Sequence, residues 1–177
     1  MTERKNLLLC LNFAQKVINE RDLSLVPKFI AAESVQHEFG DVPRELQGGP
    51  RAMTMFLSLY MRAFPDLRVT FEDALVDRDR VVTRWHLEGT QTGPLMGIAA
   101  SGRRVHVEGI RIDRIENEQI AESWMQLDML GLLEQIGALP ELRRNLAPQV
   151  TVEPSRRRCR NHGTWPEGWP AVNPSKP

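Results

Sequence analysis

The amino-acid sequence predicts an α+β fold in which a strongly bent antiparallel sheet packs against N-terminal helices. Helical periodicity of apolar residues dominates about the first 64 residues. From Phe64 to Asp128, four segments alternate apolar and polar residues, as in a sheet with one buried and one wet face. Helices followed by successive strands are typical of α+β proteins. A bent sheet wrapped around helices leaves a cavity between the layers, so we expect a pocket.

The first helix is expected over about residues 5–20. A second, short helix is expected over residues 23–31, with Asp22 as its N-cap. Pro27 weakens that helix, because a proline beyond the first turn removes a backbone donor. The apolar face of the first helix comprises Leu7, Leu11, Ala14 and Ile18.

A third helix opens at Gly49-Pro50, since proline at the first helical position loses no hydrogen bond. Pro65-Asp66 ends this helix and begins the sheet. Its apolar stripe contains Met53, Phe56, Leu57, Tyr60 and Phe64.

Two tight turns, at residues 77–79 and 116–118, favour antiparallel hairpins. The loop between them carries three glycines without the spacing of a phosphate-binding motif. A last helix follows Asp128. We expect the strands over residues 67–76, 80–88, 105–115 and 119–127.

Length and composition predict one domain over residues 1–146 and a Pro/Arg-rich extension over residues 147–177. Residues 1–149 carry 18 Lys/Arg against 21 Asp/Glu, which argues against a nucleic-acid partner for the domain. There is no apolar run of membrane-spanning length, and no partnership with a membrane is expected. The two cysteines form no disulfide framework, so a cytoplasmic protein is expected.

Four stretches carry a family resemblance. They are Ala63-Phe64-Pro65-Asp66-Leu67, GTQTGPLMGIAASGRRV from Gly89, Arg114-Ile115, and WMQLDMLGLLEQIG from Trp124. Together they resemble the SnoaL-like polyketide cyclases, which belong to the cone-shaped superfamily of nuclear transport factor two and ketosteroid isomerase. The resemblance covers about residues 5–140 and implies a nuclear transport factor two-like α+β barrel.

The resemblance also implies a reaction, a cofactor-free aldol ring closure performed by an Asp on the last strand and a His on the strand before it. An ungapped alignment on the shared motifs places these positions at Met125 and Arg111. A thioether accepts no proton from a carbon acid and a guanidinium stays protonated. The acid/base pair of the family is therefore not expected at these two positions.

Three other residues are candidates for proton transfer. His37 lies in the loop before the third helix, and histidine exchanges protons near neutral pH. Asp128 either caps the last helix or acts as a base at the mouth of the pocket. Glu122 shares a strand face with Trp124 and is either a base or a surface charge.

We expect a substrate-binding role for residues whose side chains should face the pocket. Strand alternation and the family resemblance indicate which residues these are. Arg111 needs a carboxylate if it is buried, and either Asp113 or a substrate acid meets that need. We expect Trp124 or Met125, together with Arg111, to line the cavity. The substrate-binding candidates are Arg111, Asp113, Met125, Trp124, Trp85, Phe56 and Tyr60.

Two functions remain open. The first is a small enzyme that acts by general acid/base chemistry on an apolar, carbonyl-containing molecule, without metal or organic cofactor. The second is a catalytically silent protein that binds such a molecule or serves as a dimeric interaction module. In both cases we expect a homodimer or higher homo-oligomer formed through the outer face of the sheet.

Overall fold

The computed structural model of the chain describes residues 2–37 and 48–139. These residues confirm the expected α+β class. The proposed boundary between residues 146 and 147, and the extension after it, lie outside the described residues. The described elements are α1 (Glu3–Asn12), η1 (Phe13–Asn19), η2 (Leu23–Leu25), α2 (Val26–Phe29), β1 (Ile30–Gln36), α3 (Gly49–Ala63), β2 (Arg68–Asp77), β3 (Arg80–Thr90), β4 (Arg104–Glu116), β5 (Gln119–Leu127) and α4 (Met129–Gln135).

The five strands of the described residues form one sheet in the order β1-β5-β4-β3-β2. The strands from β2 to β5 pair as antiparallel neighbours, and the two tight turns predict the β2–β3 and β4–β5 hairpins among them. The edge strand β1 was not expected, and it pairs with β5 in parallel, so the sheet is mixed. The expected helix over residues 23–31 is confirmed as far as Phe29, as η2 followed by α2, and is wrong for its last two residues, because the chain becomes extended at Ile30. Strand β1 lacks strict alternation of apolar residues, which hid it in the sequence.

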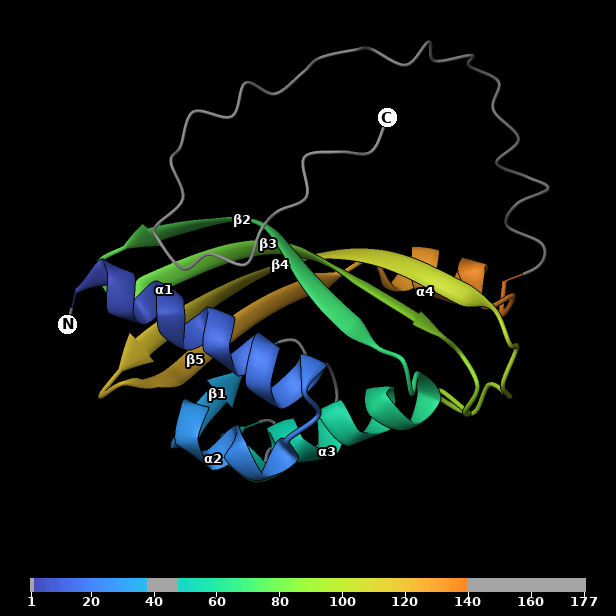
Figure 1. Cartoon of the computed structure of the whole chain (residues 1–177), viewed down its shortest axis with the longest axis horizontal. Helices are drawn as coiled ribbons and strands as arrows, with labels where there is room; N and C mark the ends of the chain where they lie inside the picture. The colour runs from blue at the N-terminus through green and yellow to red at the C-terminus, as the bar shows by residue number, and fades with distance from the viewer. Residues whose placement is uncertain (1, 38–47, 140–177) are drawn as a thin grey trace, which may run out of the picture. The chain divides into compact units, whose positions relative to one another are not determined.

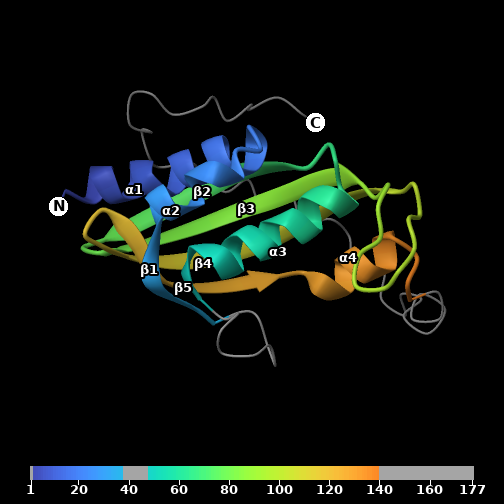
Figure 2. The same ribbon diagram turned by 90° about the horizontal axis from the view of Figure 1, so that it is seen from below.

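One face of the sheet is covered by helices (Figure 1). Helix α1 continues into η1, a wider π-helical segment, and the two correspond to the expected first helix. Helix α3 lies beside them on the same face, as Figure 2 shows from below. Its start at Gly49-Pro50 and its end at Ala63 confirm the expected third helix.

Strand register decides which side chains face these helices. The β3–β4 register pairs Thr83 with Arg111, and the β4–β5 register pairs Arg111 with Met125. Paired residues share a face of a sheet, so all three point toward the helices. Residues beside them in sequence, such as Trp124, point to the outer face.

A close approach at Gly109 lets the ring of Trp85 lie across β4. A Cβ atom on Gly109 would lie 2.4 Å from Cζ2 of Trp85, far inside van der Waals contact. Any larger residue at this position would therefore displace the Trp85 ring from the core, in which it is buried.

Candidate functional site

A cavity lies between the sheet and the helices α1, η1 and α3. Its volume is about 80 Å³, counted as space open to the centres of water-sized spheres. At roughly 10–15 Å³ for one water, this is room for a handful of waters or for a small ring compound. The apolar part of the lining includes Phe13, Ile18, Met53, Phe56, Leu57, Leu67, Val69, Phe71, Trp85, Leu87, Met125 and Leu127.

The charged groups of the cavity lining are Arg111 and Asp113, which form an ion pair. Nε of Arg111 donates a hydrogen bond to Oδ1 of Asp113 over 2.7 Å, and the Asp113 side chain is only 4% exposed. Ser123 from β5 completes the cluster, because its hydroxyl accepts from the Arg111 guanidinium at 2.8 Å and donates to Asp113. The pair is thus buried, hydrogen-bonded and directed toward an otherwise apolar cavity.

Residues of the N-terminal helices pack against the Arg111–Asp113 pair from the side opposite the sheet. The guanidinium carbon of Arg111 lies 5.5 Å from the centroid of the Phe13 ring, a distance typical of a cation–π contact. Cys10 lies beside Asp113. Burial raises the pKa of the Cys10 thiol well above its ordinary value, and the Asp113 carboxylate adds to that rise. The thiol is therefore protonated at neutral pH and is no nucleophile there.

Gln36 is a further polar residue next to this cluster. It pairs with Ser123 in the β1–β5 register, so its side chain faces the same side of the sheet. The residue is 3% exposed, and neither amide atom has a hydrogen-bond partner among the described residues. A buried amide without partners is unfavourable. Gln36 is not among the residues that line the cavity, so this cost is not a feature of the cavity wall.

Six of the seven expected substrate-binding residues line the cavity. They are Arg111, Asp113, Met125, Trp85, Phe56 and Tyr60. Two further lining residues, Cys10 and Thr83, and the adjacent polar residues Ser123 and Gln36 were not expected from the sequence. Alternation along β5 would have identified Ser123, because it lies two residues before Met125.

The seventh expected residue, Trp124, lies on the opposite face, so its assignment to the cavity is wrong. Strand alternation turns Trp124 outward when Ser123 and Met125 face inward. On the outer face its ring stacks on the imidazole of His37, with centroids 4.8 Å apart. Glu122 accepts a hydrogen bond from Arg114 and contacts Nε2 of His37 at 3.0 Å.

His37 and Glu122 are thus brought together, but outside the cavity. Arg114, and then His37, lower the pKa of the Glu122 carboxyl below its ordinary value. A lowered pKa makes the carboxylate a weaker base. Residues 38–47, which follow His37, lie outside the described residues.

Asp128 caps helix α4. Its Oδ1 accepts a hydrogen bond from the backbone N–H of Gly131 at 2.8 Å, the arrangement of an N-cap. The side chain is exposed, and the residue is not among those that line the cavity. Of the two roles left open by the sequence, the geometry therefore favours the cap.

One group among the described residues has the atoms to hold a metal ion: His86, Glu88 and His106. All three lie on the outer face, since even-numbered residues of β3 and β4 point away from the helices. Because the three residues come from two strands, no short spacing in the sequence reveals this group.

The chain is similar to a family of known sequences over most of the described region. A family model for SnoaL-like polyketide cyclases matches residues 8–136. A search of curated proteins finds none that matches the chain.

Several solved structures have the same fold. TsrD from Streptomyces laurentii is 31% identical, with 78% of this chain and 99% of that chain covered and a TM-score of 0.70. AclR from Streptomyces galilaeus, a suggested hydroxylase, is 26% identical, with coverages of 79% and 85% and a TM-score of 0.68. A SnoaL-like polyketide cyclase from Agrobacterium tumefaciens is 20% identical, with coverages of 77% and 99% and a TM-score of 0.61, a likeness of fold alone.

Proposed function

The chain belongs to the SnoaL-like polyketide cyclase family, and from this premise we propose that it is a cofactor-independent enzyme for a small, apolar, carbonyl-containing molecule. The reaction class is proton transfer at a carbon next to a carbonyl group, the step that opens an aldol ring closure or an isomerisation. The suggested hydroxylase activity of AclR agrees with a family whose fold serves more than one reaction.

The observation that carries the proposal is the Arg111–Asp113 pair at the wall of the apolar cavity. Apolar lining favours an apolar ring system, and a small set of convergent polar groups fixes its orientation. A guanidinium is a permanent cation that binds a carbonyl or enolate oxygen with directed hydrogen bonds. The neighbouring carboxylate compensates its charge, so Arg111 is tolerated in the cavity when no ligand is bound.

In the proposed reaction, the Asp113 carboxylate accepts the proton from the α-carbon of the substrate. The electron pair of the C–H bond moves into the carbonyl group, and the negative charge collects on its oxygen. Arg111 stabilises that enolate oxygen, because a fixed cation in a water-poor site acts strongly on developing charge. The enolate carbon then attacks a second carbonyl carbon, whose oxygen takes the proton back from Asp113, or the enolate recovers that proton at another carbon of its conjugated system.

The alternative is a protein that binds such a molecule without turning it over. The observation that favours it is the occupation of Asp113, which already accepts hydrogen bonds from both Arg111 and Ser123. Hydrogen bonds to a carboxylate stabilise its charged form and weaken it as a base. The silent binding protein is also favoured by Met125 and Arg111, which occupy the positions where the family resemblance implies the catalytic Asp and His.

One experiment separates the two functions. The full chain is incubated with 2-tetralone, a two-ring ketone with acidic α-hydrogens, in D₂O, and exchange of these hydrogens is followed by NMR. Binding is measured in parallel by isothermal titration calorimetry. An enzyme accelerates the exchange, and Asp113→Asn slows it by about a hundredfold to ten-thousandfold.

Asp73→Asn is the matched control, since Asp73 forms a similar 2.7 Å pair with Arg84 and its side chain is 48% exposed. Exchange at the wild-type rate in Asp113→Asn would remove Asp113 as the base. Binding of the ketone without accelerated exchange would establish the silent binding protein. No binding of this ketone or of its one-ring analogue cyclohexanone would contradict both readings of the cavity.

A further inference from the structure

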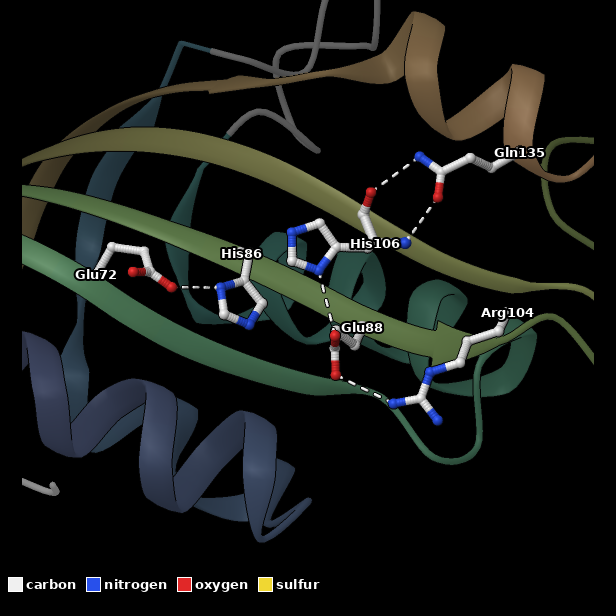
Figure 3. A network of polar contacts seen from close by, with 6 residues as sticks. All are labelled: Glu72, His86, Glu88, Arg104, His106 and Gln135. Atoms are coloured by element: carbon white, nitrogen blue, oxygen red, sulfur yellow. Dashed lines mark hydrogen bonds and ion pairs between the residues drawn. The ribbon is translucent and has the colours of Figure 1, made fainter. Parts of the chain in front are cut away.

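Two histidines that lie 20 residues apart in the sequence meet on the outer face of the sheet. The β3–β4 register pairs Glu88 with His106, and His86 lies two residues before Glu88 on the same face. The rings of His86 and His106 stack with their centroids 4.6 Å apart. Figure 3 shows Glu88 and both imidazoles converging from the two neighbouring strands.

We propose that His86, Glu88 and His106 form a binding site for one divalent transition-metal ion, of which zinc is the representative. One ligand atom from each residue lies within 4.8 Å of the others. Two imidazoles and a carboxylate are the ligand set of three-ligand zinc sites, in which water completes the coordination. The site lies on the face opposite the cavity and is independent of the proposed reaction.

The distance between two of the ligand atoms already suits a metal. Nδ1 of His106 and Oε1 of Glu88 are 3.2 Å apart. Two ligands of a tetrahedral ion, at bond lengths of about 2.0–2.1 Å, are separated by roughly 3.3 Å. A metal would replace the shared proton between these atoms with little movement of either side chain.

The third ligand is oriented by a carboxylate behind it. Nδ1 of His86 contacts Oε1 of Glu72 at 2.7 Å (Figure 3), which leaves Nε2 of the same ring as the ligand atom that His86 would offer. Carboxylates in this position are a regular feature of metal-bound histidines, because they fix the tautomer and raise the basicity of the ligand nitrogen. Glu72 would therefore act as a positioning residue and not as a ligand.

The backbone N–H and C=O groups of His106 are also fixed by hydrogen bonds. The side-chain amide of Gln135 on α4 accepts from the N–H of His106 at 2.7 Å and donates to its carbonyl oxygen at 2.8 Å. This clamp anchors β4 beyond the point at which its pairing with β5 ends at Gly109. A ligand on a fixed backbone loses less conformational freedom when it binds the ion.

Arg104 is a positively charged residue in contact with one of the proposed ligands, Glu88. Its guanidinium contacts Oε2 of Glu88 at 3.1 Å and leaves Oε1 directed at His106. The Arg104 side chain is 71% exposed, so it can move into solvent when a cation binds. Glu72 and Glu108, which pairs with His86 across the strands, offset this charge.

Titration of the full chain with ZnCl₂ after chelator treatment and dialysis tests the proposal. We expect one equivalent to bind, and we expect His86→Gln and His106→Gln each to weaken binding at least tenfold. Glu72→Gln is expected to weaken it by about 10- to 100-fold, as loss of such an outer carboxylate does in other sites. Mg²⁺, which prefers oxygen ligands, is expected not to compete.

Two controls exclude other ligands. His37→Gln removes a histidine from another part of the outer face and is expected to leave zinc affinity unchanged. A Cys159→Ser/His162→Gln double variant removes the remaining cysteine and histidine ligands of the C-terminal extension and is also expected to bind normally. Loss of binding in that double variant, or normal affinity in both His86→Gln and His106→Gln, would overturn the proposal.

A melting experiment gives a second readout. Zinc at a hundredfold excess over its dissociation constant is expected to raise the melting temperature of the wild type by roughly 5–10 °C. The shift should fall to half or less in His86→Gln, because binding there is at least tenfold weaker, and persist in full in His37→Gln. A zinc-induced shift of equal size in all variants would also contradict the site.

Discussion

Arg111 and Asp113 lie two residues apart on β4, and the guanidinium of the first donates a 2.7 Å hydrogen bond to the carboxylate of the second. Alternation along the strand gives both side chains the same face, and that face lines the cavity. Two opposite charges so close to each other compensate for much of the cost of burying either one. The pair therefore explains how an apolar cavity retains groups capable of binding an oxygen and moving a proton.

The first prediction concerns the stability of this pair. Arg111→Met or Asp113→Leu alone leaves one buried charge without its partner and is expected to cost about 3–5 kcal/mol of unfolding free energy. The double variant Arg111→Met/Asp113→Leu is expected to recover most of that loss, because no charge remains buried. Urea denaturation of the three variants measures both effects.

Arg84→Met is the control for this series. Its pair with Asp73 lies on the outer face with the Arg84 side chain 46% exposed, so its loss is expected to cost at most about 1 kcal/mol. An equal loss of unfolding free energy in Arg84→Met and Arg111→Met would contradict the prediction, because it would mean that a buried ion pair costs no more to break than an exposed one.

The second prediction concerns the helix cap. Asp128→Ala is expected to destabilise the protein by about 1 kcal/mol, because the N–H of Gly131 loses its acceptor. Asp128→Asn is expected to keep most of that stability, since asparagine is an equally good N-cap. Thermal melts of the two variants decide the matter. If Asp128→Asn melts normally but loses proton exchange on 2-tetralone, Asp128 is a base and the assignment as a cap alone is wrong.

The third prediction concerns acid. The backbone N–H of Thr90 donates a 2.6 Å hydrogen bond to Asp66 and is the main cause of the lowered pKa of that carboxyl. A folded pKa below the unfolded value of about 3.9 means that the carboxylate stabilises the fold above that pH. This stabilisation is lost as the pH falls through the folded pKa.

We therefore expect Asp66→Ala to lower the melting temperature at pH 7 and to approach the wild type as the pH falls through the lowered folded pKa of Asp66. Asp77→Ala serves as control, because the Asp77 side chain is 87% exposed and its contact with Arg78 spans 4.0 Å. A difference between Asp66→Ala and the wild type that is the same at pH 7 and pH 2.5 would rule out the linkage.

The fourth prediction concerns self-association, which we propose to occur through the outer face of the sheet. Leu75 and Ile110 lie on that face and are among the most exposed large apolar residues of the described chain. Such residues favour contact with a second copy. We expect light scattering at micromolar concentration to give a dimer mass or a multiple of it, and Ile110→Lys to shift the protein toward the monomer. Leu59→Lys on helix α3 is the control, and a wild type of one chain mass would contradict the proposal.

The alternating and helical patterns of the sequence determined the fold class and most element boundaries. Gly49-Pro50 marked the start of α3, and the segment over residues 119–127 became β5 without a shift. These features are local, because they depend on the period of apolar residues and on proline and glycine geometry. No described helix is long and apolar enough to cross a membrane, which agrees with the absence of such a run in the sequence.

The tertiary structure alone decided which strand face lines the cavity. Trp124 and Met125 are neighbours that both suit an apolar environment, so composition could not assign one of them to the inside. Packing of the helices against the face that carries Arg111 decided it, and Trp124 was left with His37 outside. The parallel strand β1 and the meeting of His86 with His106 depend in the same way on register between segments distant in sequence. Register follows from how whole strands pair and pack, and the pattern within any one strand does not contain it.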